Sequence, residues 1–424
     1  MSAPESVETF DAGAELPDLT DPRVLADIYP AFDAIRAQGP VFRSSQLRMV
    51  LVTGYDEAME VLKSPGRFSN RRTLKTAGGR RQPEVSEVLK QLYPPVETLM
   101  STDGETHDHH SGLIKGYLSG KRVRSLTEPI EGMVSRLLDT FEPGETIEFV
   151  DRFSLPLTID VLCLFTGVPY AEAALVKQAT DAEVEILGNV GSTERNVANA
   201  KLIVRMQELL TRLIAERTEN PADDLISHLV HTPPPPGRDP LTIAETVSIL
   251  RGVVLGGNET TRGLINASVH QLAREPELAE RIRNDEDAFG RFLDEALRQI
   301  SPVVMLFRNV TEDTELGGVA LRAGEMVGVS YGAANHDPRK FGCPHAWDLD
   351  RPDIRRHLAF GFGTHYCVGS PLGRLEATIA LRQIVDRFDR IEIAPGGTPA
   401  FLPSFMVRNM TSLPLRFSAR GRAG

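Results

Sequence analysis

Residues 357–369 read HLAFGFGTHYCVG, and they set one of only three cysteines in a 424-residue chain among glycines, histidines and a phenylalanine. The three glycines allow backbone conformations and close approaches that a side chain would forbid. A helix-forming run follows directly after Cys367. We therefore expect the sulfur near a helix N-terminus, where aligned backbone dipoles and free N–H groups favour a thiolate over a thiol. These neighbours argue against a cysteine that merely fills the core.

Two functional roles for this cysteine follow from the residues alone, nucleophile and metal ligand. A nucleophilic cysteine needs a base nearby, and His365 stands two positions away, so a cysteine hydrolase is one hypothesis. A zinc site needs further Cys or His residues at short spacing, but Cys343 lies far upstream without a paired C-x-x-C motif. Zinc is therefore the weaker choice of metal.

The stretch closely resembles the haem-binding loop of the cytochrome P-450 monooxygenases, which reads Phe-Gly-x-Gly-x-His-x-Cys-x-Gly. Six residues match this pattern position for position: Phe360, Gly361, Gly363, His365, Cys367 and Gly369. The resemblance implies that Cys367 is the thiolate ligand of the iron of haem b, an arrangement that favours O–O cleavage. It also implies that the glycines let the loop lie flat against the porphyrin and that Phe360 packs by the sulfur.

A second motif, GGNETT at 256–261, falls in the middle of a long helix expected within 241–270. Two glycines inside a helix cost roughly 1 kcal/mol each relative to alanine. They indicate either close packing of a second helix or a local opening of this helix over a ligand. The segment resembles the oxygen-binding helix of the same family, with one small departure at Asn258, where relatives often carry histidine or a small apolar residue.

The resemblance of this helix implies roles for four residues. Gly256 and Gly257 make room for dioxygen, Glu259 relays protons, and Thr260, rather than its neighbour Thr261, donates a hydrogen bond to the bound oxygen. The chemistry requires such a relay because two protons must reach the distal oxygen before water can leave, and this delivery needs positioned groups.

A third motif, DEALRQISP at 294–302, sets Glu295 and Arg298 one helical turn apart. Alone this is a common ion pair on a helix, worth about 0.2–0.5 kcal/mol. Beside the other motifs it resembles the family's Glu-x-x-Arg signature. The resemblance implies that Arg351, in DLDRP, completes a buried network whose role is structural.

The two propionates of a haem need cations or hydrogen-bond donors. By position, Arg308 and His365 resemble two of the family's propionate partners, and His107 matches the first residue of a His-x-x-x-Arg motif. The arginine position of that motif holds Ser111, so we expect either that Lys115 or a neighbouring histidine substitutes or that this propionate is held less tightly. A metal site in the HDHH cluster is a minor alternative.

The rest of the chain predicts a single domain that is mainly α with a minor β part, the cytochrome P-450 fold of a helix-rich body plus small sheets. Helical periodicity dominates 121–300, and short β-rich runs separated by glycines follow at 316–337. We assign 1–22 to an acidic, flexible tail and 23–424 to the domain, since no linker divides the remainder.

The net charge of −11 argues against nucleic acid as a partner, because phosphate contacts need clustered Lys and Arg. The first thirty residues do not resemble an export signal, and no apolar run reaches the length of a membrane span. We therefore expect a cytoplasmic protein that does not bind membranes. Basic residues cluster at 115–124 and at 355–356, where they could steer an acidic partner.

The resemblance as a whole implies a soluble, bacterial-type monooxygenase that inserts one atom of O2 into an organic substrate by hydroxylation or O-dealkylation. It implies electrons from NAD(P)H through a separate ferredoxin reductase and ferredoxin. The alternatives are a peroxygenase or isomerase with the same thiolate, and a haem-binding sensor. Positions that line the pocket in relatives hold apolar residues, which predict a small hydrophobic or aromatic substrate. They correspond to Val253, Val304, Leu306, Met406 and Val407.

Overall fold

The computed structural model describes residues 16–71, 73, 82–93, 96–142, 144–187 and 192–419. Most of the predicted tail lies outside these residues. Leu19 is already buried in a core cluster beside α1 (Pro22–Ala26) and α2 (Tyr29–Gln38), so the folded part begins before the predicted boundary at residue 22.

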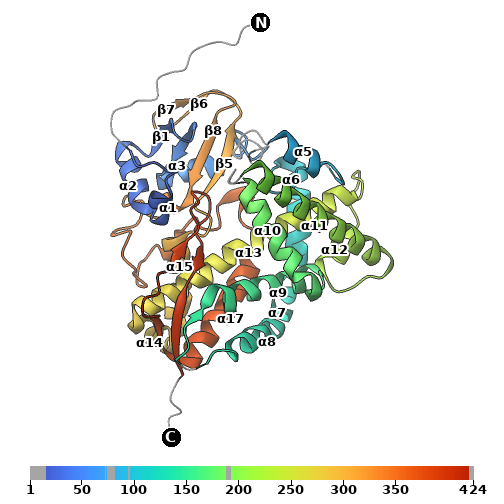
Figure 1. Cartoon of the computed structure of the whole chain (residues 1–424). Coiled ribbons are helices and arrows are strands. Elements are labelled where there is room, and N and C mark those ends of the chain that lie inside the picture. Colours follow the sequence, from blue (N-terminus) through green and yellow to red (C-terminus); the bar gives the residue numbers. More distant parts are fainter. Residues whose placement is uncertain are drawn as a thin grey trace.

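The body of the molecule is helical, and one long central helix, α13 (Ile243–Arg274), crosses it (Figure 1). The other helices and helical turns are α3 (Tyr55–Lys63), α5 (Pro83–Leu89), α6 (Gly104–Tyr117), α7 (Gly120–Ser125), α8 (Thr127–Leu138), η1 (Val150–Ser154), α9 (Leu155–Thr166), η2 (Tyr170–Glu172), α10 (Ala173–Leu187), α11 (Thr193–Glu219), α12 (Leu225–His231), α14 (Pro276–Asn284), α15 (Glu286–Ile300), α16 (Tyr331–Ala334), η3 (Ile354–Arg356), η4 (Gly363–His365) and α17 (Ser370–Arg387).

In the described part of the chain, the β structure consists of one five-stranded sheet and three smaller ones. The large sheet has the order β1-β2-β8-β5-β3 and lies with α1, α2 and α3 on one side of the molecule (Figure 1). The strands are β1 (Val41–Ser44), β2 (Met49–Val52), β3 (Phe68–Ser69), β4 (Ile147–Glu148), β5 (Met305–Val310), β6 (Thr314–Leu316), β7 (Val319–Leu321), β8 (Met326–Ser330), β9 (Phe388–Ile393), β10 (Ala400–Phe401), β11 (Met410–Ser412) and β12 (Pro414–Ala419).

Helix α13 (Ile243–Arg274) organises the core. It begins with a capping box, in which the Thr242 side chain accepts from the backbone of Glu245 and the Glu245 side chain accepts from the backbone of Thr242. Of the four apolar residues that mark one face, Val247, Leu250 and Val254 are buried, whereas Ile243 in the first turn is exposed. The helix packs on α9, α11, α15 and α17. This contact places the start of α17, directly after Cys367, against the middle of α13.

The structure confirms the predicted class, a mainly α fold with small sheets. The helix expected at 372–388 is α17, and the glycine-rich stretch at 316–337 forms β7 and β8. The proline-rich segment at 231–240 is the loop between α12 and α13. Among the described residues, no helix is both long enough and apolar enough to cross a bilayer.

Candidate active site

The loop around Cys367 is held by backbone hydrogen bonds and by glycine conformations. The Cys367 N–H donates to the Phe360 carbonyl (2.9 Å), and the Gly361 N–H donates to the Leu358 carbonyl (2.8 Å). Gly361 and Gly363 have φ angles of 68° and 72°, which L side chains rarely adopt. At Gly363 a Cβ would also stand 2.7 Å from the Leu62 carbonyl oxygen at the end of α3. The two glycines therefore fix the path of the loop across α3.

The sulfur of Cys367 lies at the N-terminus of α17, as its neighbours in the sequence predict. Burial raises the pKa of its thiol, and hydrogen bonds from the backbone N–H groups of Gly369 and Ser370 oppose that effect. Protein atoms enclose the sulfur closely enough to desolvate it, yet the residue keeps an exposed surface. Both observations hold together if the sulfur lies on the wall of a recess, a position open to a bound metal.

Helix α13 presents two glycines with different surroundings. Gly256 is exposed, and a Cβ built there would meet nothing within 4 Å. At Gly257 a Cβ would stand 2.7 Å from Leu162 of α9, so this glycine permits close helix packing. The helix runs through both residues without interruption, and the local opening considered from the sequence is absent from this described stretch. Only Gly256 therefore leaves room for a small ligand.

The alcohol on the open side of α13 is Thr260. It is partly exposed, and its Oγ1 donates to the Gly256 carbonyl (2.6 Å). Thr261 is buried, with its Oγ1 3.3 Å from a Cβ built on Gly373 of α17. The two threonines thus point to different sides, and Thr260 shares the side of Gly256, one helical turn away.

The side chain of Glu259 is buried and clamped by two donors. Its Oε1 accepts from Arg262 Nη2 (2.5 Å), and its Oε2 accepts from Asn409 Nδ2 (2.9 Å). Beside it, Asn258 is wholly buried and accepts a hydrogen bond from Thr158 of α9 (2.8 Å). Glu259 and Thr260 are therefore neighbours on α13, but the Glu259 carboxylate is bonded to Arg262 and Asn409 and not to Thr260.

Two of the predicted propionate partners and His107 come together. The rings of His107 and His365 lie 4.2 Å apart, and Arg308 is near enough to His365 to lower its pKa. Burial is the larger cause of that lowering, and a hydrogen bond to Asp103 opposes it. Among the described residues, the hydrogen bond found for the guanidinium of Arg308 runs from Nη1 to the Phe307 carbonyl (2.7 Å). Most of its N–H groups are thus available for an anion.

Asp103, immediately before α6, is a member of this group that the sequence reading did not single out. Its Oδ1 contacts His365 Nε2 (3.0 Å), and its Oδ2 accepts from the hydroxyl of Ser69. Desolvation raises the pKa of Asp103, but hydrogen bonds from His365, Ser69 and the Asn70 N–H outweigh it and lower the pKa to about 2. In the sequence, the position of Asp103 just before an expected helix was the only feature that could have indicated a role for it.

The candidates for the missing arginine differ in burial. Among the described residues, the buried Ser111 Oγ and both ring nitrogens of the buried His110 have no hydrogen-bond partner, and Lys115 is exposed, so which of them substitutes stays a prediction. Burial lowers the pKa of His110 to about 4, so it carries no charge at neutral pH. Within the described part of the chain no group of three or more His, Cys, Asp or Glu side chains could hold a metal ion, which removes the HDHH alternative.

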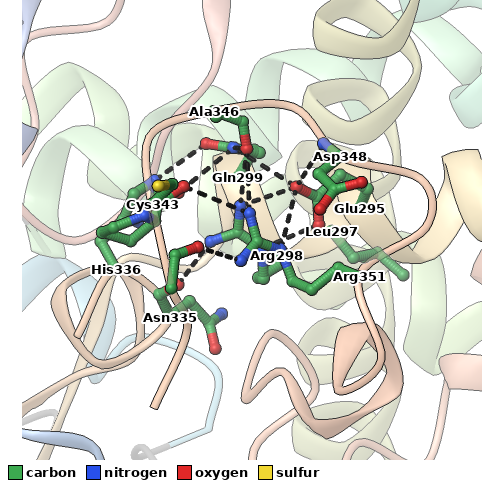
Figure 2. Close-up of polar contacts among 12 residues, drawn as sticks. Glu295, Leu297, Arg298, Gln299, Asn335, His336, Cys343, Ala346, Asp348 and Arg351 are labelled. Carbon is green, nitrogen blue, oxygen red and sulfur yellow. Dashed lines mark hydrogen bonds and ion pairs between the residues drawn. The ribbon is translucent and has the colours of Figure 1, made fainter. Parts of the chain in front are cut away.

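The third motif forms a buried polar network (Figure 2). Arg298 donates to both carboxylate oxygens of Glu295 (2.8 and 2.7 Å) and to the Asn335 carbonyl (2.7 Å). Arg351 Nε lies 3.6 Å from Glu295 Oε1, and its guanidinium also donates to carbonyls of the 342–346 loop. The geometry fixes the segment that precedes the cysteine loop and offers no open face for a substrate.

The five predicted pocket residues do not share one surface. Val253, Leu306, Met406 and Val407 are partly exposed. Val304 is wholly buried in the core beside α1 and α2, apart from these four, and its role as a pocket residue stays a prediction. The amides of Val304 and Met305 both approach the Met406 carbonyl (2.8 and 3.3 Å), which interrupts the alternation of the strand before β5 begins.

These residues fit a haem. A sulfur with two backbone donors stands on a recess wall, the exposed Gly256 on α13 leaves space, and Arg308 with His365 and His107 offers donors for carboxylates. The positive-φ glycines keep the loop free of side chains where a flat ring would lie.

Comparison with known proteins places the chain in a family. Residues 189–414 match the family model described as cytochrome P-450. The 6-deoxyerythronolide B hydroxylase of Saccharopolyspora erythraea is 31% identical over 95% of this chain and 98% of its own. The biotin biosynthesis cytochrome P-450 of Bacillus subtilis is 30% identical over 93% and 97%. The crystal structure of P450BioI with a hexadec-9Z-enoic acid ligated acyl carrier protein superposes with a TM-score of 0.84 at 30% identity, covering 93% of this chain and 100% of that one.

The chain therefore belongs to the cytochrome P-450 family, whose members are haem monooxygenases that act on small molecules with O2.

Proposed function

We propose that this enzyme inserts one atom of O2 into a small hydrophobic or aromatic substrate, by hydroxylation or O-dealkylation, with haem b bound through Cys367. The observation that carries the proposal is that Cys367 is an exposed residue whose sulfur accepts hydrogen bonds from the backbone N–H groups of Gly369 and Ser370. When bound, the haem supplies oxygen activation, and a thiolate ligand favours O–O cleavage.

The residues around the ring divide into two groups. Arg308, His365 and His107 would bind the propionates, with Asp103 fixing the ring of His365. On α13, Thr260 would donate a hydrogen bond beside the space at Gly256, and Glu259 would relay protons to it. General-acid delivery of this kind contributes typically 10²–10⁴-fold to a rate.

Apolar, partly exposed side chains support a hydrophobic substrate. Val253, Leu306, Met406 and Val407 have the exposure of residues that border a cavity. The similar P450BioI was crystallised with a fatty acyl chain on a carrier protein, which is a hydrophobic ligand.

The first experiment is the absorption spectrum of the dithionite-reduced protein with carbon monoxide, for the wild type and Cys367→His. We expect a strongly red-shifted Soret band in the wild type and its loss in the variant, because a thiolate donates more electron density than an imidazole. A wild-type spectrum like that of a histidine-ligated globin would mean that Cys367 is not the ligand. If the protein binds no haem, the proposal is wrong and the cysteine-hydrolase hypothesis becomes the better one.

We further propose that a ferredoxin, reduced by NAD(P)H through a separate reductase, docks over the cysteine loop. Phe362 and Tyr366 are exposed there, Lys63 stands 5.6 Å above the Phe362 ring, and Arg355 and Arg356 are exposed. Basic side chains around exposed aromatics suit an acidic partner. We place both proteins in the cytoplasm because all three cysteines of this chain are free.

Charge reversal tests this docking surface. Arg355→Glu should raise the apparent KM for ferredoxin severalfold, with less effect at high salt, because rim charges act mainly on association. Arg322→Glu, an exposed arginine on another part of the chain, serves as the control. Unchanged ferredoxin kinetics in Arg355→Glu would show that the partner docks elsewhere.

A further inference from the structure

Asn409 reaches the acid of α13 from the far end of the chain. It is buried just before β11, and its Nδ2 donates both to Glu259 Oε2 (2.9 Å) and to the main-chain carbonyl of Glu259 (3.1 Å). Two contacts from one amide to one residue restrict both the side chain and the helix turn that carries it. None of the sequence motifs includes Asn409.

The orientation of this amide is fixed by its other atoms. The Oδ1 of Asn409 accepts from the backbone N–H of Met410 (2.8 Å) and from Asn266 Nδ2 (3.3 Å). A backbone N–H can only donate, so the oxygen must face Met410 and the NH2 group must face Glu259. Asn409 is therefore a donor to the carboxylate and cannot exchange roles by flipping.

The approach of this segment to α13 depends on Gly263, one turn after Glu259. A Cβ at Gly263 would stand 2.9 Å from the Arg408 carbonyl oxygen, so only glycine lets the backbone of residues 408–409 lie against the helix. Arg408 holds the segment from its other side, donating to the carbonyls of Leu25 and Ala26 (2.9 and 2.7 Å). The position of Asn409 is thus set by contacts independent of Glu259.

We propose that Asn409 is a positioning residue that holds the Glu259 carboxylate in place for proton delivery. Arg262 holds one carboxylate oxygen from within α13, and Asn409 holds the other from the segment that carries Met406 and Val407. The orientation of the acid therefore depends on the same segment that borders the predicted substrate space. This inference rests on the proposed function, because it takes Glu259 as the relay.

The test uses the holoenzyme, reduced by NADH through a surrogate ferredoxin reductase and ferredoxin, without added substrate. Oxygen consumption and its solvent deuterium isotope effect are measured for wild type, Glu259→Gln, Asn409→Ala and the isosteric Asn409→Asp. The infrared carboxylate band of Glu259, assigned from its loss in Glu259→Gln, is recorded for each protein. Thr158→Val is the matched control, since it breaks a buried hydrogen bond from α9 to the neighbouring Asn258 without touching Glu259.

We expect both Asn409 variants to shift the carboxylate band, to raise the solvent isotope effect and to slow oxygen consumption about tenfold, the effect of one lost hydrogen bond to a charged group. Asn409→Asp should be the slower of the two, because it sets a second carboxylate against the first. Thr158→Val should leave the band in place and the rate within about twofold of wild type, since it removes a bond of ordinary strength elsewhere.

The outcomes separate this inference from the proposed function. If Glu259→Gln changes neither rate nor isotope effect, the proton relay itself is wrong. If Glu259→Gln is slow while both Asn409 variants keep the wild-type band and rate, only the positioning role is wrong. Equal effects of Thr158→Val and Asn409→Ala would also overturn it, because they would show a general loss of packing around α13. Should Asn409→Ala fail to bind haem, the isosteric Asn409→Asp decides.

Discussion

Two buried glutamates, one in the Glu-x-x-Arg network and one on the helix that follows the cysteine loop, stand in opposite environments. Glu295 accepts two hydrogen bonds from Arg298 and another from the Asp348 N–H (3.2 Å). Glu376 of α17 is buried, its Oε1 has no partner among the described residues, and desolvation raises its pKa to about 8. A glutamate thus has its charge compensated by partners in one region and is destabilised in its charged form by burial in the other.

The difference shows where the fold closes its polar groups and where it leaves them open. Around Arg298 the donors and acceptors of α15 and the 335–351 loop bond to one another, and Arg351 Nε is the member that has no hydrogen-bond partner among the described residues. Near the cysteine loop, the described residues leave the sulfur of Cys367 and most N–H groups of Arg308 available. Further along α17, one carboxyl oxygen of Glu376 has no partner among those residues. A densely bonded network suits a structural role, and groups without partners call for another explanation.

Arg298→Met should give the largest effect of the changes compared here. It removes the bidentate partner of Glu295 and leaves a carboxylate buried without compensation, which typically costs about 3–5 kcal/mol. We expect the free energy of unfolding to fall by that amount and the haem content to fall with it. Urea unfolding and the ratio of haem absorbance to protein measure both.

The double variant Glu295→Leu with Arg298→Met sharpens this prediction. It removes both charges, so it should recover a large part of the stability lost in Arg298→Met alone. Arg355→Ala, whose side chain is mostly exposed beside Asp294, should change stability by less than about 1 kcal/mol. If Arg298→Met were as mild as Arg355→Ala, the buried pair would not stabilise the fold.

The sequence predicts those parts of the molecule that local patterns determine. Helix α17 follows from its apolar period, Glu295 and Arg298 from their spacing on one helix, and the path of the cysteine loop from its glycines. The haem-binding role of that loop was inferred from resemblance to a family, and the family assignment is confirmed.

Contacts between distant segments are what the sequence could not supply. Asn409 meets Glu259 across 150 positions because Gly263 admits the C-terminal segment, and no local pattern records that approach. Val304 is buried apart from the other four predicted pocket residues, and the two consecutive amides that turn toward the Met406 carbonyl at this point leave no local pattern in the sequence. Gly257 was assigned to oxygen binding, but Leu162 of α9 packs against it, which only the helix pairing reveals.

Glu376→Gln tests the uncompensated member of the pair and should have the smaller effect. The pKa of Glu376 is about 8 in the folded protein against an ordinary value of 4.5, so it is raised on folding. Below about pH 4.5 the carboxyl is protonated in both the folded and the unfolded state, so its burial does not lower the free energy of unfolding by the cost of a charge. Between these values the unfolded chain releases a proton that the folded protein retains. Wild-type stability therefore falls as pH rises, by at most about 1.4 kcal/mol per pH unit.

Because glutamine does not titrate, Glu376→Gln should be as stable as the wild type near pH 5 and more stable near pH 8. Between these pH values we expect the free energy of unfolding of Glu376→Gln to rise by about 1–2 kcal/mol relative to the wild type. This is less than the maximum that one titrating proton allows, because water reaches most buried charges to some degree. Urea unfolding at several pH values measures it, with the exposed Glu315→Gln as control. A pH-independent difference would mean that a partner compensates Glu376 as Arg298 compensates Glu295, and the contrast between the two regions would then be lost.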